Sequence, residues 1–272
     1  MGLDEIPYGK WISGAAWLLR KLHLQRVVAV GREVACRGML KRYHIDVFHR
    51  MRQLALVQDV DSDIQNPPRI AQEVCTECRR LLGSLLEVGP NHLHCCIKVF
   101  VDPETDGGSV ATWVRSEPAD DRPAQIGREQ AHRVRHNTVW AVLLGETDGN
   151  TQWTAHRAFC CNDLTRHAGL FKCSRDDWKK YYKSTLALPM RLPVNPQKNE
   201  YDVIGFLTFD SPLTGVFRKV PNIFEYLDQT SAEYSEELES SMAFHAAGIL
   251  ADTLGIFVRS VVNRQNPARS EP

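Results

Sequence analysis

The sequence predicts an α/β (α+β) protein in which helices flank a central antiparallel sheet. Two kinds of pattern point to this class. In "HLHCCIKVFV" (92–101) and "SVATWVRS" (109–116), apolar residues alternate with period two, as in strands buried on one face. In residues 66–89 and 223–262, apolar residues recur every three or four positions, as on one face of a helix. The short turn "DPETDGG" between the two strands favours antiparallel pairing.

Length and composition fit one globular core with an appendage. The chain has 272 residues, of which 43% are hydrophobic and 24% charged, and its formal net charge is zero. The charges are unevenly distributed: residues 1–52 contain ten Lys or Arg against four Asp or Glu, whereas residues 221–258 contain seven acidic residues and no Lys or Arg. This asymmetry indicates a surface or partner contact.

Residues 1–58 are expected to form a basic helical segment outside the main domain. "WISGAAWLLRKLHLQRVVAV" (11–30) has the apolar spacing of an amphipathic helix, and a second helical stretch covers about 33–57. Such a helix usually packs on its own domain or on a partner. Contact of residues 10–52 with a membrane surface or with nucleic acid is the less favoured alternative. The acidic, proline-containing "DVDSDIQNPP" (59–68) is the predicted linker.

The predicted main domain, residues 69–222, begins with a helix. Asn66 and Pro67 are a helix-start signal, and Gly89–Pro90 ends the periodic pattern. The hairpin at 92–116 follows, with Leu93, Cys95, Ile97, Val99 and Val101 on one face of its first strand.

The second half of this domain is expected to hold a short helix and three strands. "NTVWAVLLG" (137–145) fits a strand or a short helix, and Asn137 as a cap with Gly145 as a stop favours the helix. Beyond it we expect a strand at 156–164, a polar loop at 165–183, and two strands at 184–190 and 201–210.

The chain closes with a predicted helix at 223–262 and a disordered tail at 263–272. A helix of roughly 40 residues is much longer than the usual globular helix. Because it contains no proline and keeps an apolar stripe, we expect it to pair with another long helix, such as its own symmetry mate in a homodimer.

The order of these elements resembles a GAF domain, a small-molecule-binding sensor domain. Four pieces carry the resemblance: "TVWAVLLG", "RAFCCNDL", "YYKSTLALPM" and "VIGFLTFDSP". They are similar to the family's short helix ending in glycine, strand closing on Asp-Leu, Ser-x-Leu strand and Ile-Gly strand, and the likeness covers about residues 66–262.

The resemblance implies a ligand pocket beneath the loop 165–183, on one face of the sheet, with helices on the other face. We expect aromatic side chains to stack on a planar ligand and polar groups to fix its orientation. The predicted pocket residues are Trp113, Arg115, Asn162, Asp163, Trp178, Tyr181, Tyr182 and Ser184. The implied function is sensing or regulation without catalysis, relayed by the terminal helices of a homodimer to a separate effector protein.

The sequence leaves the ligand and any cofactor unknown. The array typical of cyclic-nucleotide-binding GAF domains is absent, because Leu164 follows Asn162-Asp163. Bilin-binding GAF domains attach the chromophore to a cysteine that histidine commonly follows. Cys173 lies in the corresponding loop, but Ser174 follows it, which disfavours a bilin.

Two alternatives to a sensor remain open. The first is a thiol-dependent redox enzyme on a GAF fold, which would use Cys160, Cys161 or Cys173. The second is a scaffold without a pocket, which would act through protein–protein contacts. Cys75 and Cys78 have the spacing of half a zinc site, but no second pair completes it, so no metal is expected.

Asp4 and Glu5 stand where a signal peptide would be basic, which predicts a cytoplasmic protein with reduced thiols.

Overall fold

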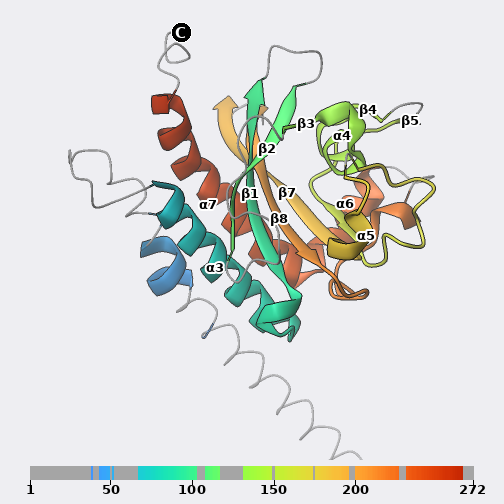
Figure 1. Ribbon diagram of the computed structural model, residues 1–272, viewed down its shortest axis with the longest axis horizontal. Coiled ribbons are helices and arrows are strands. Elements are labelled where there is room, and N and C mark those ends of the chain that lie inside the picture. Colours follow the sequence, from blue (N-terminus) through green and yellow to red (C-terminus); the bar gives the residue numbers. More distant parts are fainter. Residues whose placement is uncertain are drawn as a thin grey trace, which may run out of the picture. The chain divides into compact units, whose positions relative to one another are not determined.

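A computed structural model gives the arrangement of the chain (Figure 1). The chain divides into two compact units, Met1–His44 and Ile45–Pro272. The predicted helix at 11–30, most of the one at 33–57, and most of the linker and tail lie outside the described residues. The structure describes residues 38, 43–49, 51, 67–102, 108–116, 131–148, 151–173, 175–195, 200–226 and 231–265.

A six-stranded antiparallel sheet forms the centre of this unit, and it curls into a half-barrel. The strand order is β3-β2-β1-β8-β7-β6. Two hairpins, β1–β2 and β7–β8, supply its middle and are joined through the β1–β8 pair. The strands are β1 (His94–Asp102), β2 (Ser109–Arg115), β3 (His132–Arg133), β6 (Phe159–Cys161), β7 (Ser184–Asn195) and β8 (Glu200–Ser211). The predicted fold class, a GAF-like antiparallel sheet flanked by helices, is confirmed.

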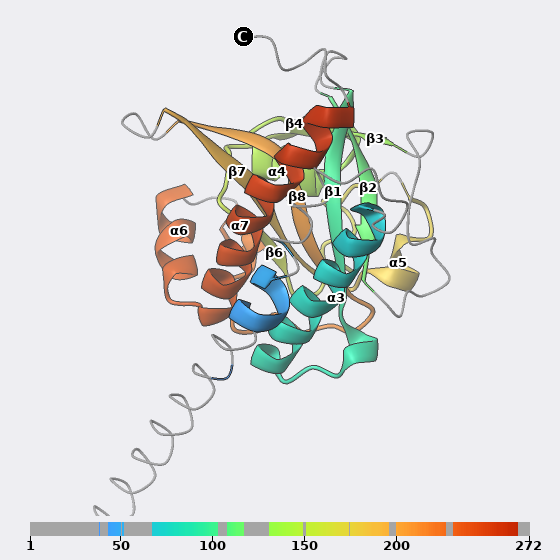
Figure 2. The same ribbon diagram turned by 90° about the vertical axis from the view of Figure 1, so that its left-hand side faces the viewer.

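Two helices cover one face of the sheet. Helix α3 (Pro67–Leu86) lies along β1 and β2, and α7 (Met242–Gln265) lies along β7, so that the two run side by side (Figure 2). The apolar face of β1 points at them, since Leu93, Cys95, Ile97 and Val99 are buried as their alternation predicted. Helix α3 begins at Pro67, within the predicted linker at 59–68, and α7 ends at Gln265, within the predicted tail at 263–272.

The opposite face carries α4 (Thr138–Leu144), α5 (Trp178–Tyr181) and the loop between β6 and β7 (Figure 1). Asn137 caps α4 by accepting a hydrogen bond from the Val139 amide at 3.0 Å. Gly145 ends it in the left-handed conformation at φ 72°, where a Cβ would lie 2.8 Å from the Ala155 nitrogen. The capping signals at Asn137 and Gly145 therefore correctly predicted a helix rather than a strand at this position.

Short elements complete the unit. A two-stranded ladder of β4 (Thr147–Asp148) and β5 (Thr151–Gln152) follows α4, which the sequence did not predict. Single 3₁₀ turns occur at η3 (Pro90–His92), η5 (Val134–His136) and η7 (Ile223–Glu225). The described residues also include a π-helix, η2 (Tyr43–Phe48), whose first two residues belong to the first unit.

The prediction of one continuous helix over 223–262 is wrong. The segment contains η7, α6 (Ser231–Glu239) and α7, and α6 and α7 are bent by 100° at residues 240–241. Ser241 causes the break locally, because its buried hydroxyl accepts from the Phe244 amide at 3.3 Å and caps a new helix. Within the described residues, no single helix is long and apolar enough to cross a membrane; α6 and α7 meet those criteria only as a bent pair.

Candidate functional site

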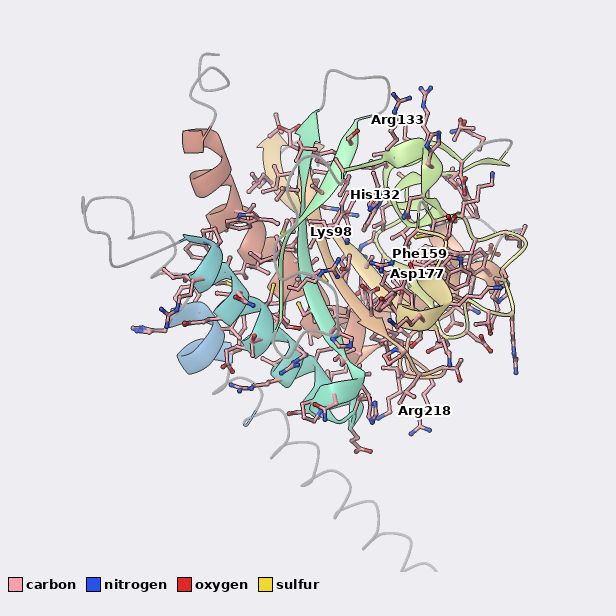
Figure 3. The ribbon with its side chains drawn as sticks, in the orientation of Figure 1. Lys98, His132, Arg133, Phe159, Asp177 and Arg218 are labelled. Atoms are coloured by element: carbon pink, nitrogen blue, oxygen red, sulfur yellow. The ribbon has the colours of Figure 1, made fainter. Side chains whose placement is uncertain are left out.

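A cavity of about 500 Å³ lies between the sheet and the loop at 165–183. Strands β1, β2, β7 and β8 form its floor, α4 one wall, and the loop its roof. Figure 3 shows Lys98, His132 and Asp177 on this side of the sheet, whereas Arg133 and Arg218 lie at the outer surface. The volume falls in the ordinary range for small-molecule sites.

A β-bulge at Trp113 gives the floor its charge. Lys98 pairs with Thr112 and Cys96 pairs with Arg115, so β2 has one residue more than β1 between these pairs. With strict alternation, Thr112 and Arg115 would face opposite sides of the sheet. The extra residue restores the register, so that both side chains face the cavity.

Small side chains on the central strands leave room above the floor. Thr208 on β8 lies between Cys96 on β1 and Ala187 on β7, all three on the cavity side. The Thr208 hydroxyl is buried and has no hydrogen-bond partner. A buried hydroxyl without a partner is unfavourable in a protein core.

Trp140 of α4 forms an aromatic wall. Its ring stacks on Phe206 of β8 with centroids 4.6 Å apart and planes inclined by 28°. The Lys98 ammonium lies 5.6 Å from the centre of the same ring. Trp140 is only 4% exposed, so the wall is held by packing before any ligand arrives.

The roof is anchored at its start by Asp148. This carboxylate is 1% exposed, accepts a hydrogen bond from the Thr138 hydroxyl, and lies 3.2 Å from the Lys172 ammonium. The Thr138 hydroxyl in turn accepts from the Lys172 amide at 2.8 Å. These bonds fix the loop to the start of α4, and the residues on either side of Lys172, Phe171 and Cys173, line the cavity.

The roof continues with a cation that lies on an aromatic ring. The Arg175 guanidinium lies 4.1 Å from the centre of the Tyr181 ring and forms a two-point ion pair with Asp177. Trp178 packs edge-on against Phe171 with centroids 4.9 Å apart. Arg175, Asp177 and Tyr182 face the cavity, while Trp178 and Tyr181 hold the roof together.

The cavity is rich in positive charge. Three cations line it, Lys98, Arg115 and Arg175, against two carboxylates, Asp177 and Asp210. His132, at the sheet edge, is influenced by these positive charges. Burial lowers its pKa, and the neighbouring charges of Lys98, Arg175 and Arg115 lower it further. The cavity therefore favours negative charge in a ligand.

Two of the eight residues predicted to line the pocket do so, Arg115 and Tyr182. Trp178 and Tyr181 belong to the loop as expected, but they are buried within the roof rather than directed at a ligand. Trp113 is the extra residue of the bulge and does not line the cavity.

The remaining three predicted residues serve the backbone instead. Asn162 donates to the Phe217 carbonyl at 3.1 Å, and Ser184 donates to the Leu213 carbonyl at 2.7 Å. Asp163 accepts from the Thr165 amide in the turn after β6. All three therefore fix the chain where β6, β7 and β8 end, and none of them lines the cavity.

Sequence reasoning missed most of the floor and the wall. The missed polar residues interrupt apolar stretches at alternate positions: Lys98 in "CCIKVFV", and Thr208 and Asp210 in "FLTFD". A polar residue every second position on a central strand, whose other face packs on helices, is the signal of a polar cavity. The lining residues missed are Lys98, Val110, Thr112, Ala131, His132, Asn137, Val139, Trp140, Phe171, Arg175, Asp177, Thr208 and Asp210.

Six of the seven described cysteines are buried. Burial raises the pKa of Cys161 to about 12 and raises that of Cys160 well above its ordinary value. Cys173 lines the cavity, and burial raises its pKa as well. Cys78 on α3 behaves like Cys160. Within the described part of the chain, no three His, Cys, Asp or Glu side chains cluster as a metal site requires.

Comparison with known proteins adds no assignment to this geometry. No protein-family model matches the chain, and no curated protein is significantly similar to it.

Proposed function

We propose that this protein is a GAF-like sensor or regulatory protein that binds a small molecule in the cavity above β1, β2, β7 and β8. The cavity with its orphaned polar groups is the observation that carries the proposal. Thr208 and Arg115 line its floor, and the Thr208 hydroxyl and the Arg115 Nε atom are buried without a hydrogen-bond partner. A structural core would satisfy such groups, whereas a binding site leaves them for the ligand.

Binding without catalysis fits the thiols better than a redox enzyme does. A nucleophilic cysteine needs a lowered pKa and access, but burial raises the pKa of Cys160, Cys161 and Cys173. The cavity also argues against a scaffold that has lost its pocket. The seven described cysteines are free thiols, which supports a reducing, cytoplasmic location.

The signal would leave the cavity through β7 and α7. Thr185 of β7 lines the cavity, and α7 lies along the same strand. At Gly255 the helix comes so close that a Cβ would lie 3.2 Å from the Arg191 carbonyl oxygen. A ligand that shifts β7 would therefore shift α7, to the extent that its affinity differs between the two positions.

A homodimer through α7 would carry that shift to an effector protein. Three large apolar residues on this helix are exposed, Met242 at 45%, Ile249 at 52% and Ile256 at 60%. They recur every seven residues, which is the spacing of a helix–helix seam. The other face of α7 is already occupied by the sheet, so the seam is available to a second copy.

The binding proposal is tested by filling the cavity. In a screen of metabolites, we expect at least one to raise the melting temperature of the wild type, because a ligand of the native state stabilises it. The change Thr208→Leu removes the orphaned hydroxyl and occupies the floor. It should leave the unliganded protein about as stable as the wild type and abolish the ligand's effect.

The matched control is Thr214→Leu, on the exposed turn after β8, which should keep the full response. A response that survives Thr208→Leu unchanged would place the binding site elsewhere. A wild type that responds to no metabolite would remove the binding proposal.

The dimer proposal predicts a change in mass. Ile249→Lys puts a charge in the centre of the seam and should convert the protein to monomers, as measured by light scattering at micromolar concentration. Leu213→Lys replaces a residue of similar exposure, 44%, outside α7 and should leave the mass unchanged. A wild type that is already monomeric would contradict this arrangement.

A further inference from the structure

Arg115 is a buried cation that has no anionic partner among the described residues. Its side chain is 4% exposed. The Nη1 atom contacts the Cys96 thiol at 3.1 Å, Nη2 lies 3.4 Å from the Thr112 hydroxyl, and Nε has no partner. A thiol and a distant hydroxyl are weak acceptors for a guanidinium, which normally pairs with a carboxylate or phosphate when buried. Within the described residues no carboxylate lies within ion-pair distance of it.

The charges around Arg115 reinforce this site rather than neutralise it. Lys98 lies opposite Thr112 on β1, and its ammonium donates to the Thr112 hydroxyl at 2.9 Å. Arg175 approaches from the roof, where Asp177 holds it. Together with Arg115, these two cations face the same cavity. The two carboxylates that line the cavity leave one positive charge in excess.

Asp210 is a buried carboxylate in the same cavity. Its carboxylate is 5% exposed and accepts a hydrogen bond from the Thr185 hydroxyl at 2.9 Å. Among the described residues it forms no ion pair, with Arg115 or with any other cation. The cavity therefore contains a buried cation and a buried anion that do not neutralise each other. A ligand that carries both complementary groups would satisfy both.

We propose that the ligand is a small molecule with an oxyanion, a carboxylate or a phosphate, that bonds to Arg115 and Lys98, and with a hydrogen-bond donor that bonds to Asp210. This assignment rests on the proposed function, because it names the ligand class of the same cavity. The competing explanation is that Arg115 is a structural link between β1 and β2 through Cys96 and Thr112. The two explanations differ in what an oxyanion does to the protein.

The test compares Arg115→Met with Arg133→Met. Arg133 lies on the edge strand next to His132, and its side chain is exposed and outside the cavity. Melting temperatures are measured with sodium phosphate, sodium acetate or sodium chloride at equal ionic strength. Phosphate or acetate should raise the melting temperature of the wild type and of Arg133→Met above the value in chloride, by about 2–4 °C at ten times the dissociation constant. Arg115→Met should show no such rise, because its affinity falls by at least about 30-fold.

The donor group is tested with matched probes. Glycine adds an ammonium group to acetate, 4-aminobutyrate adds one to butyrate, and phosphoethanolamine adds one to ethyl phosphate. At least one of these should bind more tightly than its parent anion to the wild type, and Asp210→Asn should remove the advantage. Whether the phosphate or the carboxylate series gives the larger rise identifies the oxyanion.

Each outcome decides the proposal. A wild type that responds to no oxyanion overturns it, and so does a response that Arg115→Met retains. If Arg115→Met does not fold, Arg115→Lys and Lys98→Met replace it, and both must weaken the response. If neutral metabolites stabilise the wild type but not Thr208→Leu, while oxyanions have no effect, the proposed function stands and this inference fails. If neither neutral nor anionic compounds stabilise the protein, both fail.

Discussion

The change Gly205→Ala is expected to lower the free energy of unfolding by about 3 kcal/mol or more, the largest effect of any single methyl group in the described part of the chain. Gly205 lies in β8, in the middle of the sheet, opposite Val99 on β1 and Met190 on β7. A Cβ there would lie 2.2 Å from the Lys98 carbonyl oxygen and 2.8 Å from the Met190 methyl. The methionine can move, but the carbonyl belongs to a paired strand and cannot.

The measurement is urea denaturation of both forms, and the matched control is Gly169→Ala. A Cβ at Gly169, in the roof loop, meets nothing within 4 Å, so that change should have no effect or stabilise slightly through the unfolded state. Equal stability of Gly205→Ala and the wild type would mean that β8 and β1 lie farther apart than the structure has them. Because Lys98 lies at the contact, the cavity floor would then also have a different shape.

The sequence predicted those elements whose signals are local. The alternation from Leu93 to Val99 placed the first hairpin and the side that faces the helices. Asn137 and Gly145 marked both ends of a seven-residue helix that apolar content alone left ambiguous. The position of the polar loop over a pocket came instead from the GAF resemblance, and Phe171, Cys173 and Arg175 of this loop do line the cavity.

What the sequence did not predict depends on one-residue details or on distant packing. The bulge at Trp113 reverses which side of the sheet Arg115 faces, and no composition signal reveals it. Ser241 breaks a helical pattern whose apolar period continues past it. Trp178 and Tyr181 were expected to line the pocket, but they pack against Phe171 and Arg175 within the roof and do not line the cavity.

Trp140 is a cavity residue that its sequence pattern did not reveal. Its position in "TVWAVLL" has the pattern of a residue packed between helix and sheet, and it is indeed 4% exposed. One side of its ring stacks on Phe206, yet the residue also lines the cavity. A buried residue in a helical pattern can therefore also line a cavity. Trp140 lines it and Trp178 does not, so substitutions of these two tryptophans should have different effects on binding.

Trp140→Ala is expected to lower the free energy of unfolding by about 3–5 kcal/mol and to abolish stabilisation by any cavity ligand. Trp178→Ala removes a ring of similar burial, 8% exposed, that packs on Phe171 but does not itself line the cavity. It should also destabilise the protein, but in the remaining folded protein the ligand should still raise the melting temperature. Calorimetry with the metabolite that stabilises the wild type most gives both quantities for each variant. If instead Trp178→Ala abolished binding and Trp140→Ala spared it, the ligand would bind to the roof aromatics rather than between α4 and the sheet. The wall that Trp140 and Phe206 build would then have only a structural role.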